Sequence, residues 1–354
     1  MVNSGTKSVM HSLNSGFPNA GFLTASFPNT GSQNTDSTGS LSLLDPSLTP
    51  KEEDSQLGQE LTPVQANTAL IAEGGGQRGI FTAGVLDAWL ERGYNPFALL
   101  IGTSAGAQNL SSYLTGQIGF AKQAIKGLSR DPQFVKVSRG LAGKSTVDLD
   151  WYFNQVQGES LGLDLSAGMR ALRHRQLLFS MTNGSNYQAI FRQPDKQNWL
   201  ELLKASSALP FLYRQGVPLE DSFYVDGGLS APLPVEEAYR RGATKIVVIR
   251  TMPEEYQAYT PWVNRLKSRI CSSNRCPRAI EYYLHHEAEY KRSLSFIDNP
   301  PEGVEIIQLF PRRALASKLL GSSTAELDRD YRLGRLAGFK FLKQDSLSTM
   351  KCAA

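Results

Sequence analysis

Ser104 stands between two glycines in a Gly-x-Ser-x-Gly pattern that begins at Gly102 and ends at Gly106. Residues 97–101 (FALLI), just before the pattern, form an apolar run typical of a buried strand, and a helix is expected after it. A serine on a sharp turn between strand and helix presents its hydroxyl above the sheet, and flanking glycines remove side chains that would clash there. The amide of Ala105 then points toward a developing oxyanion. This context favours a nucleophilic serine, and an ordinary tight turn is the alternative.

A glycine-rich segment, Gly74-Gly75-Gly76, follows another apolar run at residues 68–72 (TALIA) and precedes an expected helix. Successive glycines at a helix N-terminus expose amide N–H groups, and the helix dipole adds positive potential, so the segment suits a phosphate or an oxyanion. With Gly79, it also satisfies the G-x-G-x-x-G pattern of dinucleotide-binding proteins. That alternative requires an acidic residue at the end of the second strand, where the serine pattern stands instead. We therefore favour an oxyanion hole.

Asp226 is the candidate base for this serine. It ends a short apolar stretch and precedes Gly227 and Gly228, so its carboxylate lies on a loop with free approach from one side. A carboxyl group with a pKa near ~3.9 is a poor base for a hydroxyl, but burial beside Ser104 would raise that pKa, and a preorganised oxyanion hole would lower the demand on it. The sequence also allows a turn aspartate in an Asp-Gly-Gly loop.

Histidine offers a second candidate base, because the chain order Ser–Asp–His also fits a catalytic triad. His285 and His286 lie in an apparent helix, and neither follows a strand. The other two histidines are His11, in the polar N-terminal segment, and His174, in a basic stretch. A Ser–Asp pair is the preferred interpretation, and a triad with His285 or His286 stays open.

The elements that position these residues alternate between strand and helix from residue 67 to residue 252. Such alternation predicts an α/β domain with a mostly parallel central sheet. We expect residues 253–354 to form a mainly helical C-terminal region. We interpret residues 1–66, which are rich in Ser, Thr, Asn and Gly, as a flexible low-complexity arm. A secretion or targeting signal is the alternative interpretation of the arm.

Composition limits the function classes. The net charge of +4 is too small to argue for nucleic acid binding, and three cysteines exclude a disulfide scaffold. The sequence shows no apolar run long enough to span a membrane and no signal-peptide core. We therefore expect a cytoplasmic protein, with peripheral membrane contact and secretion through the arm as open alternatives.

Two further patterns carry weaker signals. Cys271 and Cys276 lie near two histidines, but their spacing matches no standard zinc site, so ordinary thiols are expected. Residues 262–278 contain five basic and no acidic residues around an apolar stripe that includes Trp262. This pattern predicts either a helix packed on the core or an interfacial lipid contact.

Three motifs in this order resemble those of the patatin-like phospholipase family: Gly-Gly-Gly-x-Arg-Gly at residues 74–79, Gly-x-Ser-x-Gly at 102–106 and Asp-Gly-Gly at 226–228. The block at residues 205–210 (ASSALP) is similar to a further block of that family. The resemblance covers residues 67–252, and the C-terminal part is similar to the tail of a bacterial subgroup. It implies a three-layer α/β/α fold and an acyl hydrolase without metal or organic cofactor.

Residue by residue, the resemblance implies that Ser104 is the nucleophile and Asp226 the base. It implies that Arg78 steadies the glycine loop or meets a lipid phosphate. The oxyanion-hole donors would then be Gly74, Gly75, Gly76 and Ala105, and the supporting motif glycines Gly79, Gly102, Gly106, Gly227 and Gly228. Gly228 replaces an alanine common in the family, and Glu73 precedes the glycines. Neither departure removes a catalytic group.

These observations together predict an enzyme that cleaves carboxylic esters of phospholipids or related lipids. Its expected partner is a lipid ester, with transient contact at a membrane surface and with neither nucleic acid nor metal. Two rivals stay open, namely a Ser–His–Asp esterase of another fold and a lipid-binding regulatory protein with little turnover. A hydrolase that needs an activator is a variant of the first prediction. Head group, acyl position and chain length are not specified by the sequence.

Overall fold

The computed structural model describes residues 62–158, 161–220, 222–256 and 277–352. Contacts between residues place Leu57–Ala354 in one compact unit. Of the predicted arm, residues 1–66, the first 61 residues fall outside the described part of the chain, whereas Gln65 and Ala66 belong to the first strand, β1 Gln65–Ala72. The interpretations of Cys271 and Cys276 as ordinary thiols and of the basic stripe at residues 262–276 also fall outside it.

The described strands form one eight-stranded sheet in the order β5-β6-β3-β2-β1-β7-β8, with β4 also paired to β3. The pairs β1–β2, β2–β3, β1–β7 and β7–β8 are parallel, and the pairs of β3 with β4, β3 with β6, and β5 with β6 are antiparallel. The predicted mostly parallel sheet is thus confirmed. The strands are β1 Gln65–Ala72, β2 Phe97–Thr103, β3 Gln176–Asn183, β4 Ala189–Arg192, β5 Val217–Leu219, β6 Ser222–Asp226, β7 Lys245–Ile249 and β8 Glu305–Leu309.

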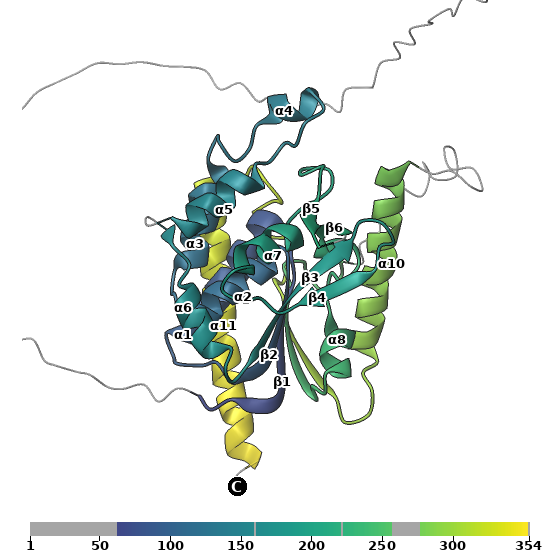
Figure 1. Cartoon of the computed structure of the whole chain (residues 1–354). Coiled ribbons are helices and arrows are strands. Elements are labelled where there is room, and N and C mark those ends of the chain that lie inside the picture. Colours follow the sequence, from purple (N-terminus) through teal and green to yellow (C-terminus); the bar gives the residue numbers. More distant parts are fainter. Residues whose placement is uncertain (1–61, 159–160, 221, 257–276, 353–354) are drawn as a thin grey trace, which may run out of the picture. The chain divides into compact units, whose positions relative to one another are not determined.

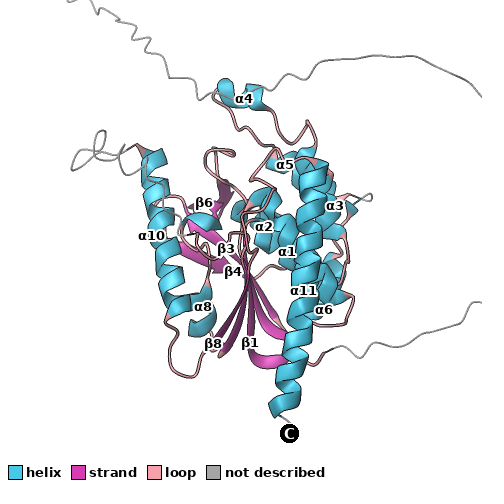
Figure 2. Ribbon diagram, turned by 180° about the vertical axis from the view of Figure 1, so that it is seen from behind, coloured by secondary structure: helices cyan, strands magenta, loops and turns pink. Residues whose placement is uncertain are grey.

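Helices cover both faces of the sheet, which makes the predicted three-layer arrangement (Figures 1 and 2). In both views α8 and α10 lie on one side, and α1, α2, α3, α6 and α11 lie on the other. The helices are α1 Gly79–Leu90, α2 Ala105–Thr115, α3 Phe120–Lys126, α4 Val137–Leu141, α5 Leu149–Gln157, α6 Leu165–Ala171, α7 Trp199–Ser206, α8 Val235–Arg240, α10 Arg278–Asp298 and α11 Thr324–Cys352.

The central strands divide their side chains between two hydrophobic cores. In β1, Leu70 packs in the core on the α1 and α2 side, while Ile71 packs in the core beneath α8 and α10. Val247 and Val248 of β7 alternate in the same way. Because both faces of these strands are buried, they read in the sequence as unbroken apolar runs rather than as alternating patterns.

The C-terminal region is mainly helical, as predicted, but it also completes the sheet. β8 pairs in parallel with β7, with Glu305 opposite Lys245 and Leu309 opposite Ile249. The sequence analysis did not predict this strand. Glu305 is exposed, the next three residues are intermediate in burial and Leu309 is buried, as expected of a strand at the edge of a sheet.

Helix α11 packs directly on α1 through glycines. A Cβ atom on Gly334 would lie 2.0 Å from the carbonyl oxygen of Phe81, and one on Gly84 would lie 2.3 Å from that of Tyr331. Trp89 at the other end of α1 donates a hydrogen bond from Nε1 to the carbonyl of Gly338, at 3.2 Å. Since α1 follows directly on the glycine-rich segment, α11 supports the helix behind the candidate oxyanion hole.

Candidate active site

Ser104 occupies the predicted turn between β2 and α2. Its backbone angles, φ 54° and ψ −122°, are sparsely populated for a residue with a side chain, so the turn is strained. The flanking glycines are required sterically. A Cβ atom on Gly102 would lie 2.4 Å from Cα of Ala107, and one on Gly106 would lie 2.1 Å from the carbonyl oxygen of Ala72. Close packing of α2 against β1 and β2 thus holds the serine in its strained conformation.

Strand β3 brings Ser104 and Asp226 together. Thr103, the last residue of β2, pairs with Ser180, and Asp226, the last residue of β6, pairs with the next residue, Met181. The two strand ends therefore meet at consecutive residues of β3. The hydroxyl of Ser104 donates a hydrogen bond from Oγ to Oδ2 of Asp226 at 2.7 Å. This is the distance expected between a nucleophile and its base.

The Asp226 side chain is 5% exposed and accepts a second hydrogen bond, from the amide of Gly228 to Oδ1 at 2.7 Å. Burial raises the pKa of Asp226 to about 6, and the hydrogen bonds from Ser104 and Gly228 oppose that increase. A Cβ atom on Gly228 would lie only 3.0 Å from Oδ1. A carboxylate with this pKa is a stronger base than an ordinary aspartate and is still mostly ionised at neutral pH.

The segment at residues 205–210 forms hydrogen bonds with both candidate catalytic residues, Ser104 and Asp226. The sequence analysis did not predict this role. Ser206 Oγ accepts a hydrogen bond from the amide of Ser104 at 2.9 Å. The carbonyl of Ala208 accepts one from the amide of Asp226 at 3.0 Å. The ASSALP block, which ends at Pro210, was a resemblance without an assigned function, and its sequence gave no indication of these contacts.

The glycine-rich loop lies beside Ser104. Gly75 and Gly76 have φ angles of 139° and 57°, which residues with side chains rarely adopt. A Cβ atom on Gly74 would lie 3.1 Å from Cβ of Ser104, so only glycine lets the loop approach this closely. No backbone hydrogen bond from the amides of Gly75 or Gly76 to another described residue is found. The amide of Ala105 is also free of intrahelical bonding, because it is the first residue of α2.

Two buried side chains anchor this loop. Glu73 accepts hydrogen bonds from the amide of Thr251 at 2.5 Å and from the hydroxyl of Tyr290 at 2.9 Å. Gln77 donates to the carbonyl of Ser129 at 3.1 Å and accepts from the amide of Ser322 at 2.7 Å. Glu73 and Gln77 thus attach the loop to segments far away in the sequence.

Arg78 lies on the same loop and lines the space beside Ser104. Its Nε atom is buried and has no hydrogen-bond partner among the described residues, and no ion pair of Arg78 occurs within that part of the chain. Arg78 therefore contributes a positive charge to the lining of this space.

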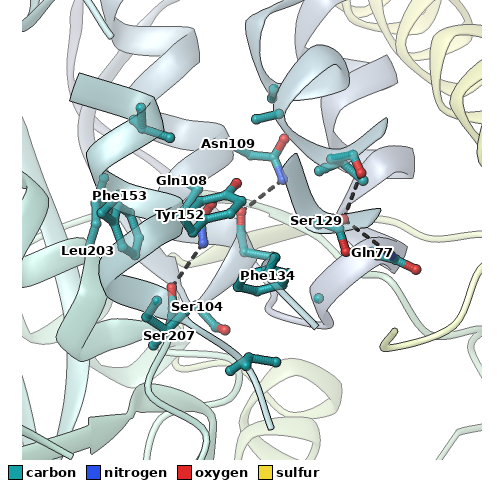
Figure 3. Close-up of a pocket in the computed structure, with 18 of the residues that line it drawn as sticks. Gln77, Ser104, Gln108, Asn109, Ser129, Phe134, Tyr152, Phe153, Leu203 and Ser207 are labelled. Atoms are coloured by element: carbon teal, nitrogen blue, oxygen red, sulfur yellow. Dashed lines mark hydrogen bonds between the residues drawn. The ribbon is translucent and has the colours of Figure 1, made fainter. Parts of the chain in front are cut away.

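Two pockets meet at Ser104 and Asp226. The first, the apolar pocket, has a volume of about 950 Å³ including the open space at its mouth. Figure 3 shows Phe134, Tyr152, Phe153 and Leu203 around it, with Ser104 at one side. Its apolar lining includes Phe120, Ile125, Phe134, Val147, Leu149, Tyr152, Phe153, Val156, Leu163, Leu203, Leu209, Leu212, Leu319 and Leu320.

The second space, the aromatic pocket, has a volume of about 1020 Å³ including its open mouth. It combines aromatic rings with the charged and polar groups of Arg78 and His286. Four of its residues belong to α10, and Leu319 borders both pockets. Its lining includes Glu73, Gly74, Gly75, Arg78, Phe211, Gly228, Met252, Tyr256, Tyr282, Tyr283, His286 and Tyr290.

The two histidines of α10 bond to groups other than Ser104 and Asp226. His285 Nε2 lies 2.9 Å from the hydroxyl of Ser230, and His286 Nδ1 lies 2.6 Å from the carbonyl of Gly228. The serine hydroxyl is already bonded to the aspartate. This arrangement is that of a Ser–Asp pair rather than of a triad in which histidine bridges the two.

The described residues contain no group of three or more His, Cys, Asp or Glu side chains that could hold a metal ion. Within the same residues, no helix is long and apolar enough to cross a membrane.

Comparison with known families gives two matches along the chain. The family described as patatin-like phospholipase matches residues 70–239, which include Ser104, Asp226 and the glycine-rich loop. A family described as a domain of unknown function matches residues 276–345, which include α10 and β8.

Similar proteins were found among curated sequences and solved structures. The uncharacterized protein YjjU of Escherichia coli is 40% identical over 285 residues, which cover 80% of this chain and 79% of YjjU. The crystal structure of VipD from Legionella pneumophila is 14% identical with a TM-score of 0.44, over 79% of this chain and 67% of VipD. The human GIVD cytosolic phospholipase A2, solved with a fluorophosphonate inhibitor, is 14% identical with a TM-score of 0.37, over 78% of this chain and 57% of that enzyme.

Proposed function

Because the chain belongs to the patatin-like phospholipase family, we propose that it is a serine hydrolase that cleaves carboxylic esters of lipids, with Ser104 as nucleophile and Asp226 as base. The observation that carries this proposal is the 2.7 Å hydrogen bond from Ser104 Oγ to the buried carboxylate of Asp226. It joins a strained serine to a base whose pKa burial has raised to about 6.

In the acylation step, Ser104 Oγ attacks the ester carbonyl carbon while Asp226 takes the hydroxyl proton. The negative charge that develops on the carbonyl oxygen is stabilised by amide N–H groups of the glycine-rich loop and of Ala105. The bond from carbon to the alkoxy oxygen then breaks, and the leaving alcohol receives the proton from Asp226. The products are a free alcohol and an acyl-enzyme on Ser104.

In the deacylation step, water attacks the acyl carbon and gives its proton to Asp226. The bond from carbon to Ser104 Oγ breaks, and the proton returns to the serine. The fatty acid leaves as the second product, and the Ser–Asp pair is restored without a metal or an organic cofactor.

The two pockets suggest how the substrate lies across Ser104. The acyl chain occupies the apolar pocket, because its lining offers mostly hydrocarbon and aromatic surface. The alcohol part then extends into the aromatic pocket, where Arg78, which forms no ion pair with another described residue, offers its positive charge to an anionic group such as a lipid phosphate.

Reaction with a fluorophosphonate probe tests the proposal, since such a probe reacts with an activated serine next to an oxyanion hole. We expect the wild-type protein to be labelled, Ser104→Ala to lose all labelling, and Asp226→Asn to react much more slowly. Ser207→Ala is a matched control, because Ser207 lines the same apolar pocket but does not contact Asp226, and it should retain labelling.

A separate sample of the protein, not treated with the probe, is then assayed with vesicles and micelles of lipid esters for release of fatty acid. A folded wild-type protein that neither reacts with the probe nor releases fatty acid, with or without added cell lysate, would contradict the proposed function. Labelling that persists in Ser104→Ala would show that a different serine is the nucleophile.

A further inference from the structure

Helix α10 places His286 in the lining of the aromatic pocket, which Ser104 and Asp226 also line. The imidazole is separated by 60 residues from Asp226 along the chain and reaches the site only because α10 packs against the loop that follows β6. Neither the Ser–Asp chemistry nor the glycine-rich loop uses this side chain.

The hydrogen bond at Nδ1 fixes the proton position on the ring. Nδ1 of His286 lies 2.6 Å from the carbonyl oxygen of Gly228, and a carbonyl can only accept, so Nδ1 carries the hydrogen. Burial lowers the pKa of His286 from its ordinary value, which keeps the ring neutral at pH 7. A neutral imidazole protonated at Nδ1 presents a lone pair at Nε2.

Within the described part of the chain, the Nε2 lone pair has no hydrogen-bond donor. Among the described residues, the hydrogen bond to Gly228 is the one found for His286. The neighbouring His285 differs, because its Nε2 lies 2.9 Å from the hydroxyl of Ser230 outside the aromatic pocket. A half-buried acceptor without a partner weakens binding of any ligand that covers it without supplying a donor.

We propose that His286 Nε2 accepts a hydrogen bond from a free hydroxyl on the alcohol part of the substrate. The site then prefers acyl esters of polyols, such as monoacylglycerols, over esters of the same acid with an alcohol that has no further hydroxyl. This inference rests on the proposed function, because it requires the acyl chain in the apolar pocket and the alcohol in the aromatic one. His286 is on this view a specificity residue and takes no part in bond cleavage.

The preference can be measured by competition between monodecanoylglycerol and propyl decanoate, which share the acyl group and differ in the hydroxyls of the alcohol. We expect the wild-type enzyme to favour the glycerol ester in kcat/KM by roughly 3- to 10-fold, the contribution typical of one neutral hydrogen bond. Both esters release the same acid, so the ratio of glycerol to propanol formed at early times from an equimolar mixture gives this value directly.

Two variants separate the roles of the ring nitrogens. His286→Asn places an amide N–H near the position of Nδ1, so it can still donate to Gly228, but it has no acceptor at the position of Nε2, and its ratio should fall to about one. His286→Gln extends an amide toward the position of Nε2 and should retain most of the preference. His285→Asn is the matched control on the same helix and should keep the wild-type ratio.

The outcomes distinguish this inference from the function on which it rests. A wild-type enzyme that cleaves both esters equally well, or a His286→Asn variant that keeps the wild-type ratio, would overturn the role of His286 and leave the hydrolase intact. Failure of folded wild-type enzyme to cleave either ester would overturn the proposed function, and the inference with it. Loss of the preference in His286→Asn together with its retention in His286→Gln is the expected result.

Discussion

Residues 70–239 and residues 276–345 contribute to the site in different ways. The first region carries Ser104, Asp226 and the glycine-rich loop on strand ends and tight turns. The second region lines the two pockets and is bonded to the glycine-rich loop. Helix α10 lines the aromatic pocket, and residues 319–320 line the apolar pocket. The proposed chemistry belongs to the first region, whereas the shape of the substrate space depends on both.

The contrast shows that the glycine-rich motif of the first region depends on contacts with the second region, which carries none of the catalytic motifs. Gln77 lies between two motif residues, and its backbone amide donates to the carbonyl of Leu319 at 3.0 Å. A Cβ atom on Gly76 would lie 2.3 Å from the same carbonyl oxygen. The conformation of the proposed oxyanion hole is therefore set partly by the C-terminal region.

Asp226→Asn tests the chemistry of the first region and has the largest expected effect. Asparagine keeps the shape and can still accept from Gly228, but it cannot take the proton of Ser104. We expect kcat to fall by about 10²- to 10⁴-fold, the usual contribution of a general base. Circular dichroism should show an unchanged fold. A decrease of less than about 10-fold would mean that another group is the base.

The pH profile is the second test of Asp226. The carboxylate must be ionised to act as a base, and burial raises its pKa to about 6, so kcat/KM should fall as the pH decreases below about 6. Because the folded state binds this proton more tightly than the unfolded chain does, the ionised side chain lowers stability above pH 6. Asp226→Asn should therefore raise the free energy of unfolding at pH 8 by about 1–3 kcal/mol. A profile that is flat between pH 5 and pH 8 would contradict both expectations.

Gly334→Val tests the packing of the second region on the first without changing a proposed catalytic residue. The new side chain would collide with the carbonyl of Phe81 and push α11 away from α1. We expect the free energy of unfolding, measured with urea, to fall by about 3 kcal/mol. Leu336→Ala on the same helix is the control, because Leu336 is 66% exposed, and it should change stability little. Equal stability of Gly334→Val and wild type would show that the two helices do not pack as described.

Gln77→Leu tests the junction between the regions. Gln77 is 1% exposed, and leucine would leave the amide of Ser322 and the carbonyl of Ser129 without their partners. We expect the glycine-rich loop to shift and kcat to fall by about 10-fold, since oxyanion stabilisation depends closely on donor position. Gln123→Leu replaces an exposed glutamine of α3 as the control. An unchanged kcat in Gln77→Leu would mean that the loop holds its shape without the C-terminal region.

The two regions also differ in how far the sequence could predict them. Glycine spacing and apolar runs predicted the strands β1 and β2 and indicated Ser104 and Asp226 as candidates, because steric rules act over a few residues. β8 was missed, since an edge strand is only half buried and lacks a strong apolar run. The contacts of Gln77, His286 and Ser206 could not be predicted, because each joins residues that only tertiary packing brings together.

Tyr290→Phe is the mildest of these changes and examines one bond between α10 and the glycine-rich loop. The hydroxyl of Tyr290 donates to Glu73 at 2.9 Å, while Glu73 also accepts from the amide of Thr251. Because Thr251 still holds the carboxylate, we expect a loss of about 1 kcal/mol in the free energy of unfolding and less than about 3-fold in kcat. Tyr239→Phe, at a half-exposed tyrosine of α8, should change neither quantity. A decrease in kcat as large as that of Gln77→Leu would instead show that α10 controls the position of the loop as strongly as residues 319–322 do. The second region would then determine the rate of the reaction as well as the shape of its pocket.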